Sequence, residues 1–74
     1  MTPELFLFTA SWCQVCPMLK ANLDKRGIEY TLVDIETEEG EALAAHYRVR
    51  GLPSLGMEGK VIGTGAEAYK TLGV

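Results

Sequence analysis

The sequence has 74 residues, of which 47% are hydrophobic and 23% charged, and its formal net charge is −3. This length predicts one domain, residues 1–74, and the ordinary composition predicts that it folds. The acidic balance and the scattered lysines and arginines argue against a nucleic-acid partner, because phosphate binding needs a clustered basic patch.

The first residues contain no basic start, no long apolar stretch and no small-residue cleavage site, so no targeting segment is expected. No apolar run approaches the ~20 residues that span a bilayer, so no membrane partner is expected. The protein is therefore expected in the cytoplasm. In that reducing compartment a close cysteine pair is more often catalytic or metal-binding than structural.

A strand–helix–strand unit is predicted in the first half of the chain. The apolar run at 4–8 (ELFLF) is typical of a buried strand, and residues 14–26 predict a helix with Cys16 and Leu19 on its inner face. Residues 28–35, rich in β-branched and aromatic side chains, predict a second strand. Because a helix joins them, the two strands are expected to be parallel.

The second half of the chain predicts a helix, a hairpin and a final helix. Thr37 is expected to cap the helix, which a Gly-Leu-Pro sequence ends. Residues 54–57 and 60–62 predict two short antiparallel strands joined by a Glu-Gly turn, and a last helix is expected to open at Thr64 or Gly65. The order βαβαββα predicts an α/β fold with a four-stranded mixed sheet and three helices.

Cys13 and Cys16 are the candidate reactive residues. Residues three apart lie on one face of a helix, so the two thiols can close a disulfide without large backbone movement. With Cys13 at the helix N-terminus and Cys16 one turn inside, the unpaired N–H groups and the helix dipole favour a Cys13 thiolate. We therefore expect an exposed Cys13 as the catalytic nucleophile and a shielded Cys16 as the resolving thiol. Pro17, near the first turn, is expected to shape the helix only.

These motifs resemble those of the thioredoxin superfamily, and the length is similar to that of glutaredoxins and small glutaredoxin-like redoxins. Residues 12–16 (WCQVC) are similar to the thioredoxin form of the motif. Residues 49–54 (VRGLPS) resemble the family's second signature, in which a cis-proline packs beside the disulfide. Residues 63–65 (GTG) resemble the small-residue turn that borders the glutaredoxin substrate groove. The resemblance covers nearly the whole chain and implies a minimal thioredoxin fold.

The resemblance implies a thiol–disulfide oxidoreductase that reduces protein disulfides by dithiol exchange, with no cofactor beyond its own redox-active disulfide. It also implies a cis Leu52–Pro53 bond, which would turn the Leu52 backbone toward an extended substrate peptide. The implied substrate-binding residues are Ser11, Trp12, Gln14, Val15, Leu52, Pro53, Thr64 and Gly65. Expected partners of a monomeric protein are disulfide-containing proteins, ribonucleotide reductase among them, and a recycling reductant.

Two departures leave the recycling reductant open between thioredoxin reductase and glutathione. Leu7 stands where thioredoxins carry a buried acid, six residues before the first cysteine. Residues 10–12 and 14–15 contain neither the lysine nor the tyrosine that glutaredoxins usually carry there. The chain therefore combines the size of a glutaredoxin with a thioredoxin-like active site, and a glutathione-dependent glutaredoxin is the alternative.

Two other classes of function stay open. The first is a metal- or cluster-binding protein. A metal site within one chain would have only Cys13, Cys16 and the distant His46, whereas zinc normally takes four ligands, so no metal is expected there. A cluster shared by two chains through Cys13 stays open. A binding module would hold a partner in the same groove and leave the cysteines incidental.

Overall fold

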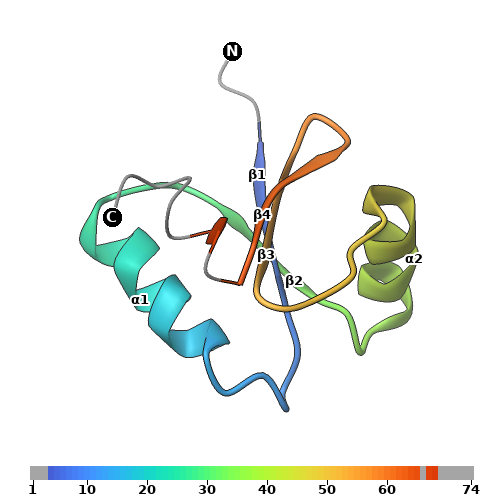
Figure 1. Cartoon of the computed structure of the whole chain (residues 1–74), viewed down its shortest axis with the longest axis horizontal. Helices are drawn as coiled ribbons and strands as arrows, with labels where there is room; N and C mark the ends of the chain where they lie inside the picture. Colours follow the sequence, from blue (N-terminus) through green and yellow to red (C-terminus); the bar gives the residue numbers. More distant parts are fainter. Residues whose placement is uncertain (1–3, 66, 69–74) are drawn as a thin grey trace.

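The structure, a computed structural model, describes residues 4–65 and 67–68 and contains a four-stranded sheet with a helix against each face (Figure 1). The elements in chain order are β1 (Leu5–Thr9), α1 (Cys16–Lys25), β2 (Thr31–Asp34), α2 (Glu38–Tyr47), β3 (Ser54–Met57) and β4 (Lys60–Thr64). Neither of these helices is long and apolar enough to cross a membrane.

The sheet has the strand order β2-β1-β3-β4 and is mixed, as expected. β1 and β2 run parallel, with Thr9 opposite Asp34, whereas β3 is antiparallel to β1 and to β4. β2 is shorter than the predicted 28–35 strand, because its ladder with β1 begins at Thr31. Ile28 and Tyr30 precede the ladder and pack against the core instead.

Two of the three predicted helices lie in the described part of the chain. The third would occupy mostly residues 66 and 69–74, which lie outside the described residues. Glu67 and Ala68 are helical, and the Ala68 N–H donates to the Gly65 carbonyl at 3.1 Å. The described architecture is therefore a four-stranded mixed sheet with two helices.

The side chains of β1 alternate between the two faces of the sheet and so contribute to two cores. Leu5 and Leu7 belong to the core with α1, and Phe8 belongs to the core with α2. The core on the α1 side consists of Leu5, Leu7, Leu19, Leu23, Leu55 and Ala68. The core on the α2 side consists of Phe8, Val33 and Tyr47, with partly buried neighbours that include Phe6 and Leu52.

The α2-side core depends on a glycine in β3. The Tyr47 ring packs against Phe8 and Phe6, with ring centroids 5.3 and 5.7 Å apart. A Cβ atom on Gly56 would lie 2.8 Å from the Tyr47 ring and 2.9 Å from the Phe8 ring. A residue without a side chain therefore lets these rings pack against β3.

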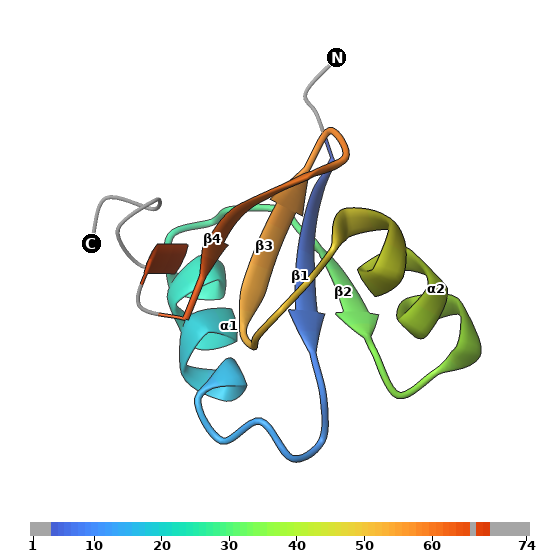
Figure 2. The same cartoon turned by 45° about the vertical axis from the view of Figure 1, so that its right-hand side comes forward.

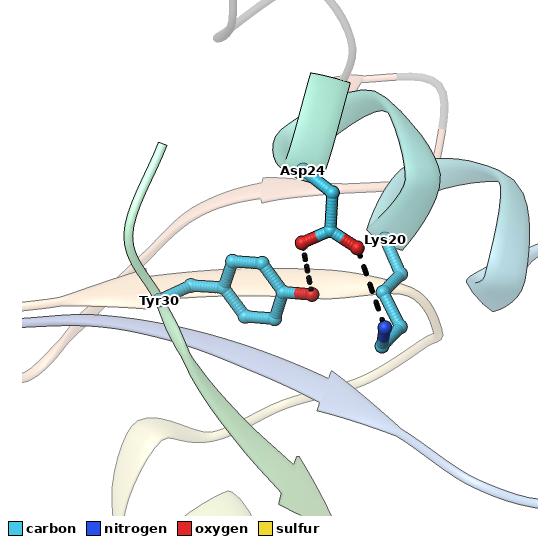
Figure 3. A network of polar contacts seen from close by, with 3 residues as sticks. All are labelled: Lys20, Asp24 and Tyr30. Carbon is cyan, nitrogen blue, oxygen red and sulfur yellow. Dashed lines mark hydrogen bonds and ion pairs between the residues drawn. The ribbon is translucent and has the colours of Figure 1, made fainter. Parts of the chain in front are cut away.

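A polar network ties α1 to the segment before β2 (Figure 3). Asp24 accepts hydrogen bonds from Lys20 Nζ at 3.3 Å and from the Tyr30 hydroxyl at 2.9 Å. Partial burial and then the bond to Asp24 raise the pKa of Tyr30, and the bond to Asp24 raises the pKa of Lys20. Because the Lys20 and Asp24 side chains are about half exposed, the network orients α1 but adds little to the free energy of folding.

Candidate active site

Cys13 and Cys16 form a disulfide in the connection between β1 and α1. Their Cα atoms lie 5.5 Å apart, and the exposed fractions are 7% for Cys13 and 3% for Cys16. The expectation of an exposed Cys13 is thus wrong for this oxidised form, because the disulfide holds Cys13 against the start of α1. Cys13 is nevertheless the more accessible of the two.

α1 begins at Cys16 rather than at Gln14, so Cys13 lies in the turn before the helix and Cys16 is the first helical residue. Pro17 explains the later start, since it has no N–H to donate to the Cys13 carbonyl and its ring would clash there. In the first turn of the helix, Pro17 leaves no intrahelical hydrogen bond unmade. The first turn of α1 itself contains no acidic residue, so within that turn nothing offsets the positive end of the helix dipole. Once the disulfide is reduced, this end of the helix would favour the thiolate.

Three apolar side chains close to the cysteines in the sequence are exposed. Trp12, Val15 and Met18 are 65%, 47% and 61% exposed. The sequence predicted the first two as substrate contacts but not Met18, although its i+3 spacing from Val15 places the two side by side on the surface. Ser11 and Gln14, also predicted contacts, are exposed in the same loop. The residues next to the buried disulfide therefore present an accessible and partly apolar surface.

The second predicted signature lies at the same edge of the sheet as the cysteine loop. Phe8 pairs with Ser54, which pairs with Thr64, so the end of β1, the start of β3 and the end of β4 meet there (Figure 2). The Leu52–Pro53 bond is cis, as expected, and Pro53 is fully buried. The two motifs, about forty residues apart in the sequence, thus converge on one edge.

Hydrogen bonds connect the residues around this proline. The buried Ser54 hydroxyl donates to the Gly51 carbonyl and shares a hydrogen bond of 3.2 Å with the Thr64 hydroxyl. The Gly65 N–H donates to the Pro53 carbonyl at 2.7 Å. Since that N–H is already engaged, Gly65 contributes to the shape of the site and does not offer this donor to a substrate.

Two leucines have roles in packing. Leu52 is partly buried and packs against the α2-side core, so its backbone, not its side chain, is the part that a peptide could pair with. Leu7 is fully buried in the α1-side core, at the position where thioredoxins carry an acid. Leu7 therefore supplies packing and no proton acceptor.

Glu36 contacts the cysteine loop, although nothing in the sequence analysis singled it out. Its Oε1 atom accepts the Ser11 N–H at 2.5 Å, across 25 residues of sequence. Hydrogen bonding to the Ser11 hydroxyl and then to the Ser11 N–H lowers the pKa of Glu36. The register of the two parallel strands would have pointed to Glu36. Thr9 pairs with Asp34, and Ser11 and Glu36 each lie two residues further along their chains.

Within residues 4–65 and 67–68, no group of three or more His, Cys, Asp or Glu side chains is placed to hold a metal ion. His46 lies on α2, with its ring 5.8 Å from that of Tyr47. The structure therefore does not bring it into a cluster with the two cysteines.

Comparison with known proteins identifies the family. The glutaredoxin family model matches residues 5–62. Thioredoxins of Pyropia yezoensis and Porphyra purpurea are each 35% identical over 57 residues, covering 72% of this chain and 53% of theirs, so the chain spans about half the length of these relatives. The crystal structure of a buckwheat glutaredoxin–glutathione complex is similar, with a TM-score of 0.62 and 26% identity over 82% of this chain and 60% of that one. The chain therefore belongs to the glutaredoxin family, within the thioredoxin superfamily.

Proposed function

We propose that the protein reduces protein disulfides by dithiol exchange through Cys13 and Cys16. The observation that carries this proposal is the Cys13–Cys16 disulfide, which lies at the start of α1 beside exposed Trp12 and at the same sheet edge as the cis Leu52–Pro53 bond. The family supports thiol–disulfide chemistry in general. Reduction of protein substrates is our extension of it.

The reaction starts from the reduced dithiol. The Cys13 thiolate attacks one sulfur of the substrate disulfide, whose S–S bond breaks, and the departing substrate thiolate takes up a proton. The Cys16 thiol then loses its proton and attacks Cys13 Sγ, which breaks the mixed disulfide and releases the second substrate thiol. Two electrons have passed to the substrate, and the Cys13–Cys16 disulfide has formed again.

The assignment of roles follows accessibility. Cys13 lies in the turn before α1 and is slightly less buried than Cys16, so we expect a substrate disulfide to reach it first. Cys16 is the first residue of α1 and lies deeper, which suits a thiol that attacks only its neighbour. Exposed Trp12 and Val15 would contact the apolar part of the substrate, and the Leu52 backbone would pair with its extended chain.

Reduction of insulin by dithiothreitol tests this function. The wild-type protein is expected to accelerate it, Cys13→Ser to abolish the acceleration, and Cys16→Ser to accumulate a mixed disulfide with the substrate. A wild-type rate no faster than dithiothreitol alone would overturn the proposal. Accumulation of the mixed disulfide by Cys13→Ser instead would reverse the two roles.

The reductant that recycles the disulfide is either thioredoxin reductase or glutathione. The match to thioredoxins favours the first, and the similarity to a glutaredoxin solved with glutathione favours the second. Re-reduction rates measured with each system, at matched protein concentration, separate the two. We further propose a monomeric protein of the cytoplasm with ribonucleotide reductase among its substrates, which reduction of that enzyme's oxidised form would test.

A further inference from the structure

We propose that Glu36 is a positioning residue for the reaction, which holds the turn before α1 in the shape that presents Cys13 and Trp12. The inference rests on the proposed function, in which this turn meets the substrate. Glu36 belongs to the connection between β2 and α2, far from the cysteines in sequence, and in this proposal it acts through Ser11.

A hydrogen bond within the turn and the contacts between Ser11 and Glu36 hold its backbone. Within the turn, the Cys13 N–H donates to the Ala10 carbonyl at 3.1 Å. From outside, the Glu36 carboxylate accepts the Ser11 N–H at 2.5 Å. Ser11 lies immediately before Trp12, whose side chain is 65% exposed and so receives little support from packing. The bond from Glu36 therefore fixes the backbone next to the two residues that would meet the substrate.

The backbone of Glu36 is itself held on both sides. Its own N–H donates to Asp34 Oδ1 at 2.9 Å. On the preceding side, the Ile35 N–H donates to the Thr9 carbonyl at 2.9 Å, which continues the contact between β1 and β2. On the following side, the Thr37 N–H donates to the Asp34 carbonyl at 3.1 Å. A carboxylate on so constrained a segment can act as a fixed anchor.

Thr37 extends this constraint into α2. Its hydroxyl accepts the Gly40 N–H at 3.0 Å and caps the helix. A Cβ atom on Gly40 would lie only 1.8 Å from the Asp34 carbonyl oxygen, so the first turn of α2 packs directly on the end of β2. Glu36, which holds the turn before α1, therefore lies between two ordered elements, the end of β2 and the start of α2.

The experiment compares Glu36→Ala with Glu36→Gln, which retains an oxygen that can accept the Ser11 N–H. The control is Glu29→Ala, which removes another exposed carboxylate. The measurements are the rate of insulin reduction, the alkylation rate of reduced Cys13 by iodoacetamide, and the midpoint of urea unfolding. Because Trp12 is the single tryptophan of the chain, its fluorescence reports the turn directly.

We expect Glu36→Ala to lower kcat/KM for insulin about 3- to 10-fold, which is the size of one hydrogen bond. Glu36→Gln is expected to stay within about 2-fold of wild type for the same reason. Glu36→Ala should lower the free energy of unfolding in urea by no more than about 1.5 kcal/mol, because the same hydrogen bond also stabilises the fold. The Trp12 emission should change in Glu36→Ala only. A wild-type rate in Glu36→Ala, or an equal loss in Glu36→Gln, would overturn the proposal.

This design separates the inference from the proposed function. If the wild-type protein fails to reduce insulin, the proposed function fails, but the fluorescence and the exchange rate of the Ser11 amide still test the anchor. Unchanged fluorescence and unchanged Ser11 exchange in Glu36→Ala would refute the positioning role whatever the protein reduces.

Discussion

Replacement of Ser54 by alanine tests whether a buried hydroxyl holds the proline loop in place. Ser54 is fully buried at the start of β3. Its hydroxyl donates to the Gly51 carbonyl, on the other side of Leu52 and Pro53, and it shares a hydrogen bond with the Thr64 hydroxyl on β4. The substitution removes both bonds without adding bulk.

The loss of stability in Ser54→Ala depends on whether water can bind the Gly51 carbonyl and the Thr64 hydroxyl once the Ser54 hydroxyl is gone. A buried polar group left without a partner destabilises a protein by about 1–3 kcal/mol. Gly51 and Thr64 are only half-buried, so water can replace part of what each loses. We therefore expect a loss near the lower end, about 1–2 kcal/mol. At about 4–8 °C per kcal/mol for a domain of this size, Tm should fall by about 4–16 °C.

Urea unfolding of the oxidised protein, followed by far-ultraviolet circular dichroism, measures this loss. The matched control is Thr64→Val, which removes one of the two partners and leaves the bond from Ser54 to Gly51, so its loss should be the smaller. A Ser54→Ala loss below about 0.5 kcal/mol, less than one ordinary hydrogen bond, would refute the reasoning. An equal loss in Thr64→Val would show that the bond across the strands, and not the bond to Gly51, carries the effect.

Three further predictions concern the rest of the chain. Gly40→Ala should destabilise the fold by at least about 2 kcal/mol in urea unfolding, because its Cβ would overlap the Asp34 carbonyl; wild-type stability would contradict the close packing of α2 on β2. Because the pKa of Glu36 is lowered, its bond to Ser11 is complete above the usual value of 4.5 and is lost as the pH falls through the lowered pKa. The chemical shift of the Ser11 amide should therefore titrate in that acidic range in the wild-type protein. In Glu36→Gln it should not titrate. Tyr30→Phe should lower stability by no more than about 1 kcal/mol, since the bond it removes is exposed, and a larger loss in thermal unfolding would give that network a greater role.

The fold was predictable where the signals are local. A continuous apolar run predicts a strand that is buried on both faces, and in β1 the neighbours Leu7 and Phe8 do face opposite cores. The cap at Thr37 was predicted from residue type and is present, with the Gly40 N–H as its donor. The parallel pairing of β1 and β2 followed from the helix between them.

The start of α1 was mispredicted because two local signals compete there. The inward spacing of Cys16, Leu19 and Leu23 is real, and all three are buried. That spacing says which face is inward but not where the helix begins. Pro17 decides the start, since a helix that began at Gln14 would need the N–H that proline lacks. Pro17 is therefore a better guide to the start of the helix than the apolar periodicity. Because the helix starts at Cys16, Cys13 lies outside it.

The candidate site was predictable only in the parts that are close in sequence or belong to a known signature. The spacing of Cys13 and Cys16 and the Leu52–Pro53 pair are of this kind. Met18 and Glu36 are not, because their relation to the site depends on exposure and on strand register. Neither quantity can be read from residue type alone.

The register nevertheless explains why the site lies where it does. The parallel strands β1 and β2 end at one edge of the sheet, with Thr9 opposite Asp34. Ser11 and Glu36 each lie two residues beyond that pair, so the register of β1 and β2 places them close enough for their hydrogen bond. Because β3 runs antiparallel to β1, it begins at this same edge, directly after Pro53. One register error between β1 and β2 would separate the carboxylate from the cysteine loop, so the pairing of the sheet sets the geometry of the proposed reaction.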